Sequence, residues 1–167
     1  MPNAPESSAH LTGLLWGLSG GFLTYLHRMN AHIQLSSGAG QTSTSDFYFP
    51  DQDQDQFDYH LLTGTLTFTG GVRVVAHHGL LNVAFVAPWL VISDRSVRLS
   101  VADERGESLP RIELADVSLP TPTCDGTTLM WSGAQTYLLE SGLSLFGDAY
   151  PASTSLAPIT LRIPWRE

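Results

Sequence analysis

The chain has 167 residues, of which 43% are hydrophobic and 14% are charged. This composition can build one core and is too poor in charge for disorder, so we expect one domain over 11–163, between a loose segment at 1–10 and a tail at 164–167. The net charge of −8, with only eight basic residues, excludes nucleic-acid binding and disfavours binding to an anionic membrane surface.

The N-terminal part predicts one helix. Apolar residues at spacings of three and four share one helix face, and they are Leu18, Phe22, Tyr25, Leu26 and Met29. Ser19 suits the N-cap of this helix, and Asn30 lies where it would end. The region lacks the basic start of a secretory signal, and its glycines interrupt any membrane span. The sequence as it stands therefore predicts a cytoplasmic protein, or an extracellular or cell-surface protein if an export signal was removed.

Most of the remaining chain has the alternation of half-buried strands. This pattern is found at His32–Leu35, Leu62–Phe68, Val72–His77, Leu81–Phe85, Val97–Val101, Ile112–Leu114 and Ile159–Ile163. Gly, Pro, Asp and Ser turns separate these segments, and a second short helix is expected around Leu138–Phe146. The predicted fold class is mostly β (α+β), an antiparallel β-sandwich or barrel-like domain with one N-terminal helix.

Common catalytic and calcium motifs are absent. The chain has no Gly-x-Ser-x-Gly elbow, and it contains no lysine for a phosphate loop or a Schiff base. Asp51, Asp53 and Asp55 resemble the start of a calcium loop, but Gln56 and Leu62 stand where an EF-hand needs Gly and Glu. We interpret this run as a solvated acidic loop.

Histidine and cysteine give no metal site by spacing alone. The neighbours His77 and His78 would point to opposite faces of a regular strand, so a zinc site would need His27 or His60 as well. Cys124 has no cysteine partner, and we interpret it as an ordinary loop thiol.

Tyr25 on the predicted helix and His77 near a strand end form a more informative pair. A phenol is neutral at pH 7 because its pKa is near ~10, but a ferric ion favours its deprotonated form. Tyrosine is a known proximal ligand of haem, and a nearby imidazole can hydrogen-bond the ligand oxygen and orient it. The alternative is that Tyr25 is an ordinary core residue of an amphipathic helix.

A series of short segments follows in a fixed order along most of the chain. These segments are Trp16-Gly17-Leu18 with Phe22 and Tyr25, Phe47–Pro50, Gly64–Phe68, Val72–Leu80, Gly142, Phe146-Gly147, Tyr150-Pro151-Ala152 and Leu156-Ala157-Pro158. Their order resembles the Htaa domain family of actinobacterial haem-uptake proteins, over about residues 11 to 163. The resemblance implies a mostly-β fold with a helix that carries an axial tyrosine.

The resemblance also implies a haem site. Tyr25 matches the iron ligand of the family, His77 matches its histidine, and Tyr150 matches a second pocket tyrosine. Phe22 and Trp16 are expected to pack near the porphyrin. The chain departs from the family before Tyr25, where polar or basic residues that would hold the haem propionates are replaced. Backbone N–H groups at the helix start are an alternative partner for those carboxylates.

We therefore predict a non-enzymatic protein that binds, stores or passes ferric haem, with another haem-carrying protein as its partner. One alternative is a haem-dependent enzyme, with His78 or His27 near an open sixth position of the iron. Another alternative is an Htaa-like scaffold without haem, which the lost polar residues before Tyr25 would favour.

Overall fold

The computed structural model describes residues 12–18, 24, 26–42, 46–79, 81–102, 111–146 and 150–165. Its strands are β1 (Gly13–Trp16), β2 (His32–Ser36), β3 (Gly40–Gln41), β4 (Phe47–Pro50), β5 (Phe57–Asp58), β6 (Thr63–Thr67), β7 (Gly71–Ala76), β8 (Leu81–Val86), β9 (Trp89–Ile92), β10 (Val97–Ala102), β11 (Arg111–Ser118), β12 (Thr123–Cys124), β13 (Thr128–Leu138) and β14 (Ser155–Pro164). Two 3₁₀ helices, η1 (His77–Gly79) and η2 (Glu140–Phe146), interrupt them. The segment expected at 1–10 lies outside the described residues.

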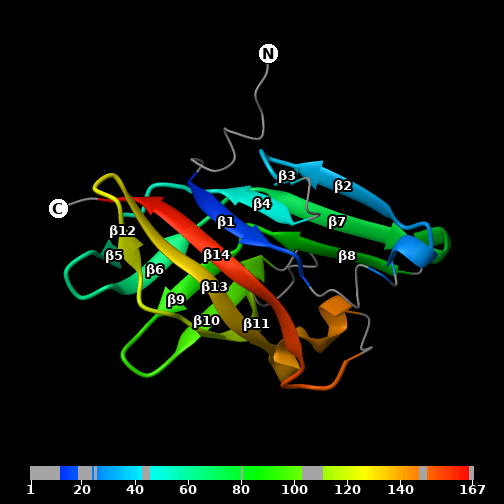
Figure 1. Cartoon of the computed structure of the whole chain (residues 1–167). Helices are drawn as coiled ribbons and strands as arrows, with labels where there is room; N and C mark the ends of the chain where they lie inside the picture. The colour runs from blue at the N-terminus through cyan, green and yellow to red at the C-terminus, as the bar shows by residue number, and fades with distance from the viewer. Residues whose placement is uncertain are drawn as a thin grey trace, which may run out of the picture.

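The strands form two antiparallel sheets (Figure 1). The large sheet has the order β3-β4-β1-β14-β13-β11-β10-β9-β6-β5, with β12 paired to β13. The small sheet has the order β2-β7-β8 and projects beside it (Figure 1). The expected mostly-β antiparallel fold is confirmed.

The large sheet curls until its two sides meet. Asp51, directly after β4, forms an isolated antiparallel bridge with Phe68, directly after β6. Two backbone hydrogen bonds flank this bridge, from Gln52 N to Thr67 O at 3.1 Å and from Thr69 N to Pro50 O at 2.8 Å. The sheet is therefore barrel-like, and its closure rests on a few bonds.

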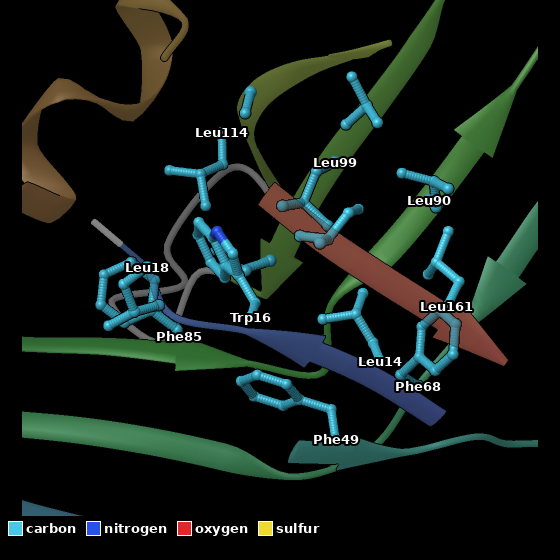
Figure 2. Packing of buried hydrophobic residues seen from close by; sticks show 14 of the residues in the cluster. Leu14, Trp16, Leu18, Phe49, Phe68, Phe85, Leu90, Leu99, Leu114 and Leu161 are labelled. Atoms are coloured by element: carbon cyan, nitrogen blue, oxygen red, sulfur yellow. The ribbon is translucent and has the colours of Figure 1, made fainter. Parts of the chain in front are cut away.

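The core fills the curled sheet and continues under the small sheet (Figure 2). Its largest fully buried side chains include Trp16, Phe47, Phe49, Phe68, Phe85, Phe146, Leu14, Leu18, Leu66, Leu90 and Leu99. In β7, Val72, Val74 and Ala76 are buried while Arg73 and Val75 are less so, as the alternation predicted.

Several strands have no clear alternation in the sequence. β1 lies between β14 and β4, and three of its four residues are buried. Consecutive apolar residues are typical of a strand that is covered on both faces, where the period of two disappears. β13 is the longest strand, but its pairing with β14 shifts register beside Gly133, which has φ +67°. This irregularity hides its period from a sequence reading.

The predicted N-terminal helix is described only at its end. Residues 24 and 26–28 are α-helical, whereas 19–23 and Tyr25 lie outside the described residues. The helix ends at Asn30, as predicted, because this residue takes a left-handed φ of 52°. Asn30 N donates to His27 O at 3.2 Å and Ala31 N donates to Leu26 O at 3.0 Å, which is the Schellman arrangement. The second expected helix is confirmed as η2, which begins after Leu138.

Candidate functional site

The inner face of the small sheet is entirely apolar. Residues directly opposite each other in an antiparallel pair share a face, so the register defines this face. Its members are Ile33 and Leu35 of β2, Val72, Val74 and Ala76 of β7, and Leu81, Val83 and Phe85 of β8. Val72, Val74 and Phe85 are fully buried, whereas Ile33 and Leu35 are 37% and 42% exposed. The face is thus covered at its centre and open along β2.

The same sheet carries no acidic residue, although the chain has sixteen. No Asp or Glu occurs between residues 7 and 45 or between 59 and 93, the stretches that contain β2, β7, η1 and β8. Arg73 is on β7, and the exposed Arg28 and His27 precede β2. Arg73 is opposite Gln34 and Ala84, so it lies on the other face of the sheet. An apolar face without carboxylates, with Arg28 near it in sequence, suits an apolar ligand that carries negative groups.

A chain of aromatic rings connects two of the predicted site residues. Trp16 meets Phe85 edge-on, with 5.9 Å between the ring centroids. Both side chains are labelled in Figure 2. Phe85 lies 5.4 Å from Phe146, and Phe146 lies 6.1 Å from Tyr150. The structure therefore brings Trp16 and Tyr150 to the same side of the core through Phe85 and Phe146, and no pattern in the sequence indicated this link.

Trp16 is sealed, whereas Tyr150 is partly open. The Trp16 ring is 1% exposed, and its Nε1 donates to the carbonyl oxygen of Ala157 at 2.9 Å. Tyr150 is half-buried and packs against the core beside Phe146. Trp16 therefore supports the candidate site from within the core, and Tyr150 can present part of its ring to a ligand.

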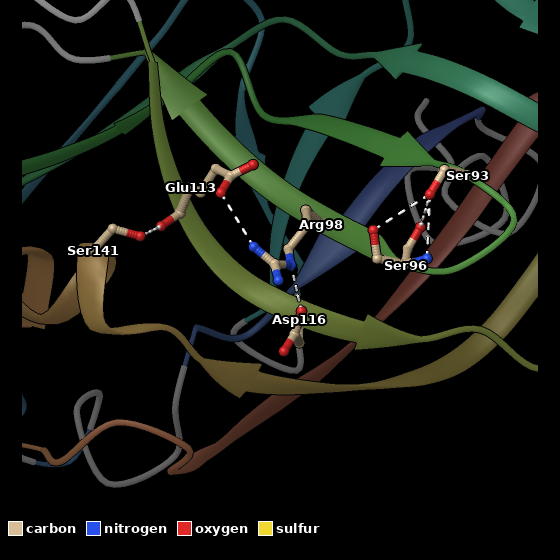
Figure 3. Close-up of polar contacts among 6 residues, drawn as sticks. All are labelled: Ser93, Ser96, Arg98, Glu113, Asp116 and Ser141. Carbon is tan, nitrogen blue, oxygen red and sulfur yellow. Dashed lines mark hydrogen bonds and ion pairs between the residues drawn. The ribbon is translucent and has the colours of Figure 1, made fainter.

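η2 is held firmly on β11, which fixes Phe146. The Ser141 hydroxyl donates to Glu113 O at 2.5 Å, beside the ion pairs of Arg98 with Glu113 and Asp116 (Figure 3). Gly142 lies so close to β11 that an added Cβ would stand 2.8 Å from the carbonyl oxygen of Leu114. The position of Phe146 is thus set by backbone contact.

The two adjacent histidines form a turn at the end of the small sheet. η1 connects β7 to β8, and within it His78 has φ 57° while Gly79 has φ +92°. His78 is exposed. The description of His77 covers its backbone only, and that backbone directly follows the apolar face.

Tyr25 and Phe22 lie outside the described residues, so their predicted roles stay predictions. Their described neighbour Leu26 is 2% exposed and belongs to the core. The end of the helix is therefore packed onto the same core as the aromatic chain.

Other parts of the described chain offer weaker sites. Within the described residues, no three His, Cys, Asp or Glu side chains gather to hold a metal ion. Cys124 is exposed on β12. A shallow depression of about 590 Å³ lies at β5 and β6, beside Asp55, Phe57 and Asp58, but it is wide open. Across the described ranges, no helix has the length and apolar character that a bilayer crossing requires.

Comparison with known proteins gives a consistent result. The family described as Htaa matches residues 12–162. The C-terminal domain of HtaA from Corynebacterium glutamicum superimposes with a TM-score of 0.74 at 22% identity, over 92% of this chain and 95% of that one. The N-terminal domain of the same protein gives 0.73 at 23% identity, over 90% and 96%.

A third solved structure, the heme binding protein HtaB from the same organism, has a TM-score of 0.66 at 20% identity, over 90% of this chain and 91% of its own. At these identities the solved structures establish the fold. No curated protein matches the chain.

Proposed function

The chain belongs to the Htaa domain family, and from that membership we propose that it is a haem-binding protein that holds ferric haem through the phenol oxygen of Tyr25. Its role is to bind, store or pass haem, with another haem-carrying protein as donor or acceptor. The observation that carries the proposal is the apolar face of the small sheet, which has no carboxylate on its strands and ends at the histidine turn. One solved relative is described as a heme binding protein, which supports a binding role over a catalytic one.

The residues present fit the chemistry of haem. The macrocycle is flat and apolar, and the apolar face next to η1 consists of the buried Ala76 and the partly buried Leu81 and Val83. Haem also carries two propionates, which the many acidic residues of this chain would repel elsewhere on its surface. Arg28 is an exposed cation that lies three residues after the proposed iron ligand Tyr25 in the sequence.

The proposed roles divide between ligand and support. Tyr25 supplies the anionic oxygen, and His77 donates a hydrogen bond that orients it. Tyr150 lies at the margin of the pocket, Phe22 contacts the porphyrin, and Trp16 fixes the shape of the pocket from within the core. Tyrosinate ligation stabilises ferric iron, and protonation of the Tyr25 oxygen would favour release of haem.

Hemin titration followed by absorbance spectroscopy tests the proposal. We expect saturable binding with a high-spin ferric tyrosinate spectrum, which Tyr25→Ala abolishes. Tyr137→Ala is the matched control, because Tyr137 is 41% exposed on β13 and should leave the spectrum unchanged. An unchanged spectrum in Tyr25→Ala would reject this ligand.

The same titration separates the alternatives. Peroxide turnover above that of free hemin would indicate a haem-dependent enzyme. Absence of saturable binding would leave a scaffold without haem.

A further inference from the structure

The edge strand β2 lacks the features that protect sheet edges. Its sequence is His32-Ile33-Gln34-Leu35-Ser36, without a formal charge or a proline. Its register with β7 is unbroken over all five residues, so no bulge twists the edge away. Natural monomers block long edges with charged residues, prolines or bulges, because a free edge templates pairing with another chain. The outer strands β3 and β5 of the large sheet are only two residues long. β8, the other edge strand of the small sheet, lies against η2 and β10, whereas β2 contacts only β7 among the larger element contacts.

β2 is also exposed on both faces, and its inner face is apolar. Among the described residues, five large hydrophobic side chains are exposed, and Ile33 and Leu35 are two of them. They stand opposite the fully buried Val74 and Val72, on the core side of the sheet. Within the described part of the chain, the apolar face therefore stops at an edge that pairs with no further strand, instead of at a polar border.

We propose that β2 pairs antiparallel with β2 of a second copy of this chain. A register centred on Gln34 sets Ile33 of each copy opposite Leu35 of the other, on the shared inner face. The two small sheets then become one sheet of six strands with a continuous apolar side. The inference does not depend on haem binding.

Charge favours this edge for self-association over other parts of the surface. Two copies of net charge −8 repel each other, but the strands of the small sheet hold none of the sixteen acidic residues. Approach through β2 therefore brings no carboxylate of these strands against another. Two edges of five residues bury far less than the ~1,200 Å² of a stable interface, so we expect a weak, reversible dimer.

A charge swap at the centre of the register tests the pairing. Gln34 is exposed and would face Gln34 of the other copy. Sedimentation velocity of the full chain from micromolar to millimolar concentration should show a monomer–dimer equilibrium. Gln34→Lys alone and Gln34→Glu alone should each weaken it by about five-fold, since like charges directly opposite destabilise a strand pair. An equimolar mixture of the two variants should restore association.

Crosslinking checks the register. Directly opposed residues have Cα atoms about 4.5–5.5 Å apart, which a disulfide can bridge. Gln34→Cys with Cys124→Ser should therefore crosslink on mild oxidation, whereas Val91→Cys with Cys124→Ser, on the interior strand β9, should not.

Two results would overturn the proposal. One is a chain that stays monomeric at millimolar concentration. This result would overturn the proposal even if hydrogen exchange showed the β2 amides protected, because another segment or another protein would then cover the edge. The other is a dimer that the Gln34 variants neither weaken nor restore on mixing.

Discussion

At the scale of single residues, the buried side-chain amide of Gln54 makes hydrogen bonds of the kind that a neighbouring strand would make. Gln54 is 1% exposed within an otherwise polar run. Its Nε2 donates to Thr67 O at 2.9 Å, and its Oε1 accepts from Thr67 N at 2.9 Å. This pair of bonds extends the short ladder that closes the large sheet. The acidic run therefore has a structural role that its composition did not reveal, because only burial separates Gln54 from its neighbours.

Replacing Gln54 by leucine should destabilise the fold. The change removes the acceptor of the Thr67 N–H and one of the two donors to the Thr67 C=O, so we expect a loss of about 1–3 kcal/mol in the free energy of unfolding. Gln56→Leu is the matched control at an exposed position of the same run, with an expected effect within about 0.5 kcal/mol. Urea denaturation measures both, and equal losses would contradict the role of Gln54.

Asp125 should make stability depend on pH in acid. Backbone N–H groups of Thr127 and Thr128 donate to its carboxylate and lower the pKa of Asp125 below its usual value of 3.8. A lowered folded pKa adds stability above the unfolded pKa, and this part is lost as pH falls through the folded pKa. The melting temperature of Asp125→Ala should therefore lie below that of the parent at pH 7, and the gap should narrow below pH 3.8. Asp125→Asn keeps the acceptor oxygen without its charge, so its stability should vary less with pH; a constant parent–alanine gap would contradict the prediction.

At the scale of elements, the sequence predicts a strand best where one face of the strand is exposed to solvent. β7 alternates in sequence and in burial because one side packs on the core, whereas β6 and β10 alternate in sequence without an alternating burial. β1 lacks this signal because residues on both of its faces are buried, and β13 lacks it because of its irregular pairing. For the candidate site, the roles of the named residues stay predictions. Trp16 and Tyr150 follow from the family resemblance, whereas their connection through Phe85 and Phe146 depends on tertiary packing.

The helix end gives a prediction at this scale. Asn30 takes the left-handed conformation that closes the helix, and asparagine tolerates it better than a β-branched residue. We expect Asn30→Val to lose about 1–2 kcal/mol of stability, whereas Asn30→Gly stays close to the parent. Thermal unfolding compares the two variants. Equal melting temperatures would mean that the left-handed cap does not contribute.

At the scale of the whole molecule, charge is divided unevenly between the two sheets. The acidic residues lie outside the strands of the small sheet, and the same chain carries a net charge of −8. The net charge therefore repels anions in general, and this repulsion is weakest near the small sheet, which carries Arg73 on its outer face and follows Arg28 in the chain. If the proposed haem binding is correct, this division gives the two propionates an approach that is free of carboxylates.

Hemin affinity should therefore depend on the position of a charge more than on the net charge. Arg28→Glu and Arg95→Glu make the same change in net charge, but Arg28 precedes β2 while Arg95 lies in the exposed turn between β9 and β10. At low salt we expect Arg28→Glu to weaken hemin binding several-fold and Arg95→Glu to bind like the parent. At high salt the hemin affinities of Arg28→Glu and the parent should become similar, because screening shortens the reach of surface charges to about 10 Å or less. An acidic residue near the C-terminal end of a helix can also lower stability. Arg28→Gln removes the charge without adding a negative one, and its hemin affinity should lie between those of the parent and Arg28→Glu. If both glutamate variants weakened binding equally, net charge alone would govern hemin binding, and the acid-free sheet would have no special part in it.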